Sequence, residues 1–325
     1  MKARKARERA ILEMVYDIVQ FDSVRDSESP DFILQHRSEQ EYFGVEITEF
    51  YLTDSDARTR FIPGYVSSLF AGGQVRHKDD IDTLKVEKAT LTRADGSGEE
   101  IIDVIRRKLP EVSTYAQLVA AAIERKGQKM SSYTRGLSHV NLIVLDQEKR
   151  LTTASPERFY SQFYTSVLRD VLARTGFREV FFVTVLGDTK RVYIPLKALF
   201  LLSEFYMFYW ALGQYEGDKE YDSIRTEVDL FVEFMLQRGV SIDILDSADE
   251  GVELLWGNNG ISVNTSGTTV TNYADFALPR CIDTPDRCAR SSLLDPSFLT
   301  FLEDFTEQNT FVSDMTVEVL RDSQV

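Results

Sequence analysis

Two nearly continuous apolar runs of strand length, residues 140–145 and 180–186, constrain the fold of this chain most. A strand that is apolar on both sides must be covered on both faces of its sheet. Amphipathic patterns at 3–20, 114–133 and 156–174 predict the covering helices. Extended segments at 32–35 and 42–50 precede these runs, joined by a polar, hairpin-like connection. The order predicts an α/β fold with a mixed central sheet flanked by helices.

The rest of the chain does not repeat this pattern of buried strands and amphipathic helices. Residues 51–113 contain glycine pairs and charged runs, which predict an insertion of short helices and loops. Beyond residue 190, helical patterns at 196–212 and 223–237 precede a predicted β-meander at 252–273. We therefore expect an α/β core over 1–190, with the insertion at 51–113, and an α+β accessory domain over 191–325.

The charge is divided unevenly between these two parts. Residues 1–190 hold 28 Lys and Arg against 29 Asp and Glu, whereas residues 191–325 hold 9 against 23. Because cations drive binding to polyphosphates, the acidic part should not form the principal nucleic-acid track. The N-terminal basic cluster either contacts phosphates or solvates a helix end. This cluster comprises Lys2, Arg4, Lys5, Arg7 and Arg9.

Several classes of protein are excluded by what the sequence lacks. No stretch approaches the roughly 18–20 uncharged apolar residues that span a bilayer, so we expect no membrane partner. The charged N-terminus lacks the apolar centre of a secretory signal. Cys281 and Cys288 have no accompanying Cys or nearby His, which argues against a disulfide framework or a conventional zinc site. A cytoplasmic location fits these features best.

Two acidic residues stand in strand-like contexts early in the chain. Asp31 directly precedes the first extended segment, and Glu46 lies within the second. Alternation directs Glu46 and Thr48 away from the apolar Val45 and Ile47, toward a face that Asp31 can share. Converging carboxylates bind divalent metals, which acidify water for attack on phosphorus. In the alternative, Asp31 merely follows a turn proline and Glu46 faces solvent.

Two helical positions add to this pair of acids. Lys126 falls near the centre of the apolar face of the helix expected at 114–133. Burying its charge alone costs several kcal/mol, so it either extends to solvent or meets a partner that the carboxylate pair supplies. On the first helix, Glu8 projects onto the apolar face and Glu13 points roughly opposite. Glu8 is the better third acid, although its place near a helix end leaves the choice open.

The segments Pro30-Asp31-Phe32 and Gly44-Val45-Glu46-Ile47-Thr48, with the helix acid and the helix lysine, resemble the PD-(D/E)XK nuclease superfamily. The resemblance implies a restriction-endonuclease-like core in which Glu8, Asp31 and Glu46 hold Mg²⁺, with Mn²⁺ as a substitute. Thr48 stands where the family pattern has lysine. The chain looks like the variants in which that lysine has moved to the following helix, here as Lys126.

The resemblance implies a metal-dependent nuclease that hydrolyses phosphodiester bonds, favours DNA over RNA, and takes part in bacterial or phage genome defence. In this role Lys126 orients the attacking water or neutralises developing charge. Thr48 favours the alternative, a catalytically inactive binding or scaffold protein whose acidic C-terminal domain engages a protein partner. A third interpretation is an assembly module, because the aromatic residues of 196–212 pack either a core or a homodimer interface.

Overall fold

A six-stranded sheet with the strand order β1-β2-β3-β6-β7-β8 forms the centre of the computed structural model. The strands are β1 (Phe21–Asp26), β2 (Phe32–His36), β3 (Tyr42–Phe50), β6 (Val140–Asp146), β7 (Val180–Leu186) and β8 (Lys190–Pro195). The structure describes residues 2–36, 41–75, 77–92, 96, 98–107, 114–133, 136–147, 165–186, 190–216, 224–246, 252–256, 259–264, 267–272 and 294–308.

The sheet is mixed, as the sequence predicts. β3, β6 and β7 run parallel, whereas β1, β2 and β8 pair antiparallel with their neighbours. Two strands were not expected. β1 lies between the first expected helix and the first expected extended segment, and β8 follows β7 directly. β1 escaped the prediction because it is an edge strand with mostly exposed or half-buried side chains, so it lacks apolar alternation.

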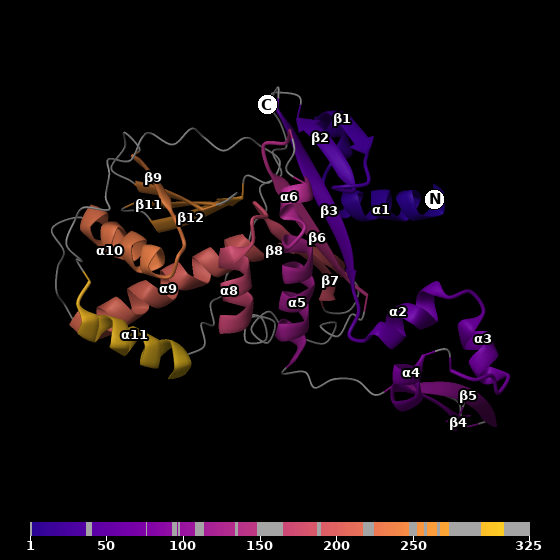
Figure 1. Ribbon diagram of the computed structural model, residues 1–325. Helices are drawn as coiled ribbons and strands as arrows, with labels where there is room; N and C mark the ends of the chain where they lie inside the picture. Colours follow the sequence, from indigo (N-terminus) through magenta and orange to yellow (C-terminus); the bar gives the residue numbers. More distant parts are fainter. Residues whose placement is uncertain are drawn as a thin grey trace.

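Helices cover both faces of the sheet (Figure 1). Helix α1 (Lys2–Val15), followed by the short 3-10 turn η1 (Ile18–Gln20), packs Leu12 and Val15 against Val45 and Ile47 of β3. Helices α5 (Tyr115–Gly127) and α8 (Ser166–Arg174) share the hydrophobic cluster of the other face. The short helix α6 (Met130–Tyr133) follows α5. Strand alternation therefore directs Glu46 toward the α5 side.

Gly44 permits a close approach between β3 and the segment before β2. A Cβ atom at this position would lie 2.5 Å from Pro30 Cγ and 2.9 Å from Leu137 Cδ1. The proline ring therefore packs directly on the backbone of β3, and this contact sets the position of the adjacent Asp31.

We expect Gly44→Ala to lower the stability of the chain by roughly 1–3 kcal/mol, because the added methyl group forces Pro30 or Leu137 to move. Gly98→Ala is the matched control, since a Cβ atom there meets nothing within 4 Å. Urea unfolding of both variants measures the difference. Equal midpoints for the two variants would show that the packing at Gly44 is slack.

The insertion comprises three short helices and a long β-ribbon. The helices are α2 (Asp54–Phe61), α3 (Tyr65–Phe70) and α4 (Lys78–Thr83), and the ribbon pairs β4 (Leu84–Thr92) with β5 (Glu99–Arg107). The ribbon corrects the expectation of loops between the short helices. The fully buried carboxylate of Asp80 accepts hydrogen bonds from Arg58, Ser55 and Tyr65, which together hold the three helices in place.

In the described residues of the C-terminal part, three helices accompany a second sheet. The helices are α9 (Leu196–Glu216), α10 (Ile224–Gln237) and α11 (Pro296–Gln308), and the sheet has the order β12-β11-β10-β9. β10 (Val252–Trp256), β11 (Asn259–Asn264) and β12 (Gly267–Asn272) form the expected meander, and β9 (Asp243–Asp246) is additional. Cys281 and Cys288 lie outside the described residues.

Helix α9 packs within the chain instead of presenting an apolar surface. Phe205 and Phe208 are buried against α10, and Leu199 and Phe200 belong to the cluster of the central sheet. Most apolar side chains of 196–212 are therefore packed in the core. Few of them are left exposed for the homodimer interface that was the alternative. Trp210, which is 44% exposed, is an exception.

A buried polar network crosses the predicted boundary near residue 190. The Glu179 carboxylate accepts hydrogen bonds from the Lys197 backbone N–H of α9 and from Asn259 of β11. Burial raises the pKa of Glu179, and burial lowers the pKa of the Lys197 amine to about 8. The division into two domains remains a prediction, and these contacts lie where the two parts meet.

None of the helices that the structure describes is long and apolar enough to cross a membrane.

Candidate active site

Glu46 and Lys126 meet on the face of the sheet that α5 covers. The Lys126 Nζ atom lies 2.5 Å from Glu46 Oε1 and 3.3 Å from the backbone oxygen of Ile47. The Glu46 side chain is buried, and that of Lys126 is 21% exposed. Lys129, in contrast, is exposed. The structure therefore brings Lys126 to the carboxylate that the sequence argument assigns to it.

Asp31 joins this pair through the pairing of β2 with β3. Phe32 pairs with Val45, and the Ile47 backbone N–H donates a hydrogen bond of 2.9 Å to Asp31 Oδ2. Burial and the nearby negative charge of Glu46 raise the pKa of Asp31 to about 6. The solvent-facing alternative fails for Glu46, which is about 95% buried, and Asp31 is buried to a similar degree.

Glu8 approaches Asp31 through two basic residues of α1. Lys5 Nζ lies 2.9 Å from Glu8 Oε2 and 3.6 Å from Asp31 Oδ1, and Arg4 pairs with Glu8 at 2.7 Å. Although burial opposes the change, hydrogen bonds from Lys5 and Arg4 lower the pKa of Glu8. Glu13 is exposed and pairs with Arg9, so Glu8 is the helix acid that lies near the site.

The Asp31 and Glu46 carboxylates fit a divalent cation better than the full set of three acids does. Glu46 Oε2 is buried without a hydrogen-bond partner, which leaves one oxygen available as a ligand. A cation between the two carboxylates would also offset the repulsion that raises the pKa of Asp31. Within the described ranges, no group of three or more His, Cys, Asp or Glu side chains stands close enough to hold a metal ion. Lys5 and Arg4 lie where Glu8 would otherwise approach the pair.

Tyr133 and Lys5 are the site residues that sequence reasoning missed. Tyr133 is buried, and burial together with the negative charge of Glu46 raises the pKa of its phenol. Its helical spacing from Lys126 was the available signal, but the sequence alone assigns it to the apolar core. Lys5 looked like one of several surface cations, yet its amine donates to the Ser27 backbone oxygen at 2.6 Å.

The N-terminal basic cluster is largely engaged inside the chain. Arg7 pairs with Glu49 and Arg9 with Glu13, while Lys5 lies between Glu8 and Asp31. Of the cluster side chains that the structure describes, Arg4 is the most exposed, at 72%. Lys5 therefore holds α1 against the segment before β2, and Arg4 pairs with Glu8 while most of its side chain stays exposed. Whether the cluster contacts phosphates remains a prediction.

No family model matches the chain, and no curated protein or solved structure matches it. The geometry at Asp31, Glu46 and Lys126 therefore carries the functional argument.

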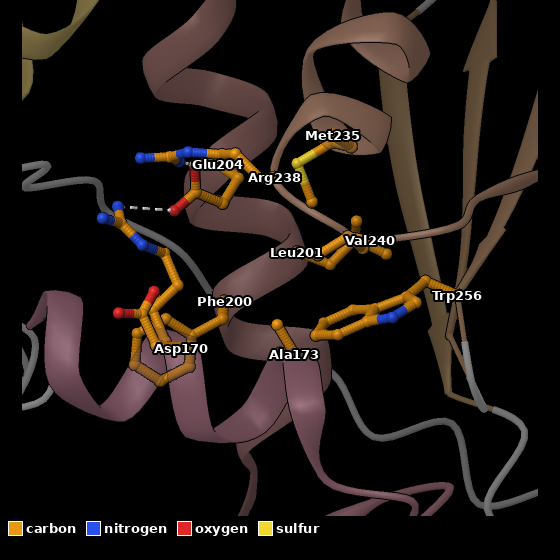
Figure 2. Close-up of a pocket in the computed structure, with 10 residues that line it drawn as sticks. Asp170, Ala173, Phe200, Leu201, Glu204, Met235, Arg238, Val240 and Trp256 are labelled. Atoms are coloured by element: carbon orange, nitrogen blue, oxygen red, sulfur yellow. Dashed lines mark hydrogen bonds and ion pairs between the residues drawn. The ribbon is translucent and has the colours of Figure 1, made fainter.

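A pocket among α8, α9, α10 and β10 lies in a different part of the molecule. Figure 2 shows Arg238 reaching Glu204 on one side, with the indole of Trp256 on the other. Glu204 is buried and pairs with Arg169 at 3.0 Å and with Arg238 at 2.5 Å. At about 180 Å³ the pocket is smaller than the roughly 300–1,000 Å³ of typical ligand sites. We interpret Glu204 as a clamp that joins three helices.

Glu204→Ala is expected to destabilise the chain by roughly 2–4 kcal/mol, because it removes the carboxylate that two half-buried guanidinium groups share. Asp304→Ala, on the exposed side of α11, serves as the control and should change stability little. Thermal and urea unfolding measure both variants. A loss no larger than that of the control would mean that the clamp contributes nothing.

Proposed function

We propose that the chain is a metal-dependent nuclease whose active site comprises Asp31, Glu46 and Lys126. One observation carries the proposal: a buried carboxylate pair whose Glu46 has one oxygen bound by Lys126 and the other without a hydrogen-bond partner. Metal-dependent hydrolysis of a phosphodiester needs ligand oxygens for the cation and a positive group for the developing charge. The resemblance of the surrounding segments to PD-(D/E)XK nucleases supports the same assignment.

Each residue has a distinct task in this proposal. Asp31 and Glu46 would hold Mg²⁺ or Mn²⁺, and a bound cation supplies Lewis-acid polarisation and a more acidic water. The Ile47 backbone N–H fixes the orientation of Asp31, and Lys126 fixes that of Glu46. Lys126 also places its positive charge beside the carboxylates, where it orients water or stabilises negative charge on a phosphate oxygen. Glu8 would complete the ligand set once Lys5 and Arg4 release it.

The proposed substrate is nucleic acid, with DNA favoured over RNA. The 14 excess negative charges of residues 191–325 leave the region around the central sheet as the place for phosphate contacts. An acidic surface repels DNA over a Debye length of about 8–10 Å, so it confines substrate without attracting it. Genome defence and a cytoplasmic location remain expectations of the resemblance and the composition.

Incubation with supercoiled, linear and single-stranded DNA and with RNA, in Mg²⁺, Mn²⁺ or EDTA, tests the proposal. We expect cleavage with either metal, none in EDTA, and none by Glu46→Gln protein purified in parallel. The inactive variant guards against a contaminating nuclease, because a contaminant would cleave in both preparations. Absence of metal-dependent cleavage of every substrate would reject the enzyme assignment.

A catalytically inactive binding protein is the second candidate, and a specific contact favours it. Lys5 and Arg4 occupy the carboxylate oxygens of Glu8 and approach Asp31, as cations do in a site that never binds metal. Thr48 in place of lysine is consistent with this function. DNA binding that is independent of Mg²⁺, in a chain without nuclease activity, would support this candidate.

A further inference from the structure

The Lys5 amine lies in a cage of oxygen atoms beside Asp31. Its Nζ atom is 2.6 Å from the backbone oxygen of Ser27 and 3.3 Å from that of Asp31. It also lies 2.9 Å from Glu8 Oε2 and 3.6 Å from Asp31 Oδ1, and the side chain is 15% exposed. Carboxylates and backbone carbonyls are also the ligands that hard divalent cations take. The Lys5 ammonium therefore occupies a position that suits a cation.

The cage and the carboxylate pair share Asp31. Its Oδ2 atom accepts the hydrogen bond from the Ile47 N–H, whereas its Oδ1 atom faces Lys5. The Arg4 guanidinium lies 3.8 Å from the same Oδ1 atom. A divalent cation bound to Oδ1 would meet both positive charges at close range, and like charges repel. Lys5 and Arg4 must therefore withdraw before Oδ1 can serve as a ligand.

The first two turns of α1 are attached in a way that permits such a withdrawal. None of the side chains at 4–9 is buried, and ion pairs hold this segment in place. The buried side chains of the helix begin at Ile11 and Leu12, which pack in the cluster under the sheet. Segments with few buried apolar contacts open at low free-energy cost. The polar turns can therefore leave while the apolar part of α1 stays packed.

A nucleic-acid substrate supplies anions that can draw these cations away. The Arg4 side chain is 72% exposed, so a phosphate can reach it from solvent. Phosphate oxygens accept charge-assisted hydrogen bonds from Lys and Arg, as carboxylates do. Each cation that turns to a phosphate frees a carboxylate oxygen of Glu8 or Asp31. Substrate and divalent cation then favour the same state of α1, and two ligands that favour one state strengthen each other's binding.

We propose that Lys5 competes with the divalent cation for Asp31 and Glu8, and that substrate phosphate releases it by drawing the first two turns of α1 away. This inference rests on the proposed function and adds its regulation, because the site then binds metal tightly only when nucleic acid is present. Lys126 contacts Glu46 from the α5 side and stays in place throughout.

Titration with Mn²⁺, followed by the electron paramagnetic resonance signal of the free ion, measures the competition without any need for catalysis. We expect Lys5→Met to bind Mn²⁺ about tenfold more tightly than the wild-type chain, within the roughly 5–150-fold range of coupled sites. Arg9→Met is the matched control, since it removes one positive charge from the same helix at a residue paired with the exposed Glu13. It should change the affinity about twofold or less. Circular dichroism checks that both variants fold.

A short DNA duplex with hydrolysis-resistant phosphorothioate linkages tests the release by substrate. The duplex should tighten Mn²⁺ binding by the wild-type chain about tenfold more than it tightens binding by Lys5→Met. Direct contacts between the cation and phosphate act in both proteins, so they cancel in this ratio. Mn²⁺ that the duplex binds alone is measured separately and subtracted.

Acetylation of lysine side chains in the wild-type chain gives a second measurement that needs no variant. Mn²⁺ should raise the acetylation rate of Lys5 severalfold, because the amine leaves its cage. The exposed Lys129 is the internal reference, and its rate should stay constant. Mass spectrometry of the digested chain reads both rates.

Equal Mn²⁺ affinities of the wild-type chain and Lys5→Met, or unchanged acetylation of Lys5 at saturating Mn²⁺, would overturn the competition and leave the proposed function standing. Equal tightening by the duplex in both proteins would overturn the release by substrate. If neither protein binds Mn²⁺ even with the duplex present, the proposed function itself is rejected, so the two failures are distinct.

Discussion

Lys126→Met is expected to reduce the rate of DNA cleavage by roughly 10²–10⁴ while leaving the fold intact. Methionine keeps an apolar stem of similar length at this position of α5, so the change removes mainly the positive charge beside Glu46 Oε1. Single-turnover rates at saturating Mg²⁺ measure the effect on the chemical step, and substrate affinity is measured separately.

The neighbouring lysine provides the control for this prediction. Lys129 lies on the same segment but is exposed, so Lys129→Met should retain nearly all activity. A similar loss in both variants would indicate that the lysines contact substrate phosphates generally. Full activity of Lys126→Met would remove Lys126 from the proposed catalytic residues.

Asp31→Asn is expected to abolish metal-dependent cleavage and, without metal, to stabilise the chain by roughly 1–3 kcal/mol near pH 8. Asparagine keeps an oxygen that can accept the Ile47 N–H, and it removes the negative charge that faces Glu46. Glu46→Gln should abolish cleavage as well, because it removes the charge of the second ligand. Mg²⁺ should stabilise the wild-type chain against thermal unfolding but neither variant.

The stabilisation by Asp31→Asn depends on pH in a predictable direction. The pKa of Asp31 is raised from 3.8 to about 6 in the folded chain, so ionisation of this carboxyl opposes folding. The wild-type chain should therefore gain stability from this group as pH falls from about 7 to 4, and the advantage of the variant should shrink over the same window. Unfolding at several pH values in EDTA measures the difference. An advantage that is constant across this window would contradict the assigned repulsion.

Strong local patterns made the central sheet predictable. Residues 140–145 and 180–186 are apolar runs typical of strands buried on both faces, and the covering helices followed from apolar spacing. β1 was missed because its sequence lacks both apolar alternation and a continuous apolar run. β8 was missed because its apolar run, residues 192–194, is only three residues long and adjoins the predicted boundary near residue 190. The ribbon was missed for a related reason: the charged and apolar residues of β4 and β5 satisfy no single buried face.

The sequence predicted which residues form the candidate site better than it predicted the contacts between them. Alternation directed Glu46 away from the core of α1, and a lysine on the apolar face of α5 needed a carboxylate partner. The sequence could not show that Lys5 would bridge Glu8 and Asp31, because that contact depends on where α1 crosses the sheet. The spacing of Tyr133 placed it on the apolar face of its helix, so the sequence carried no sign that its hydroxyl lies near Glu46.

A crystal structure of the chain soaked in Mn²⁺, with anomalous diffraction recorded at the manganese edge, tests the central claim most directly. We expect an anomalous peak between Asp31 and Glu46, at about 2.0–2.3 Å from one oxygen of each. We also expect Lys126 to remain beside the site and Lys5 to move away from Asp31. Absence of the peak, with Lys5 and Arg4 still pairing with Glu8 and Asp31, would contradict a metal-dependent site and favour the binding protein.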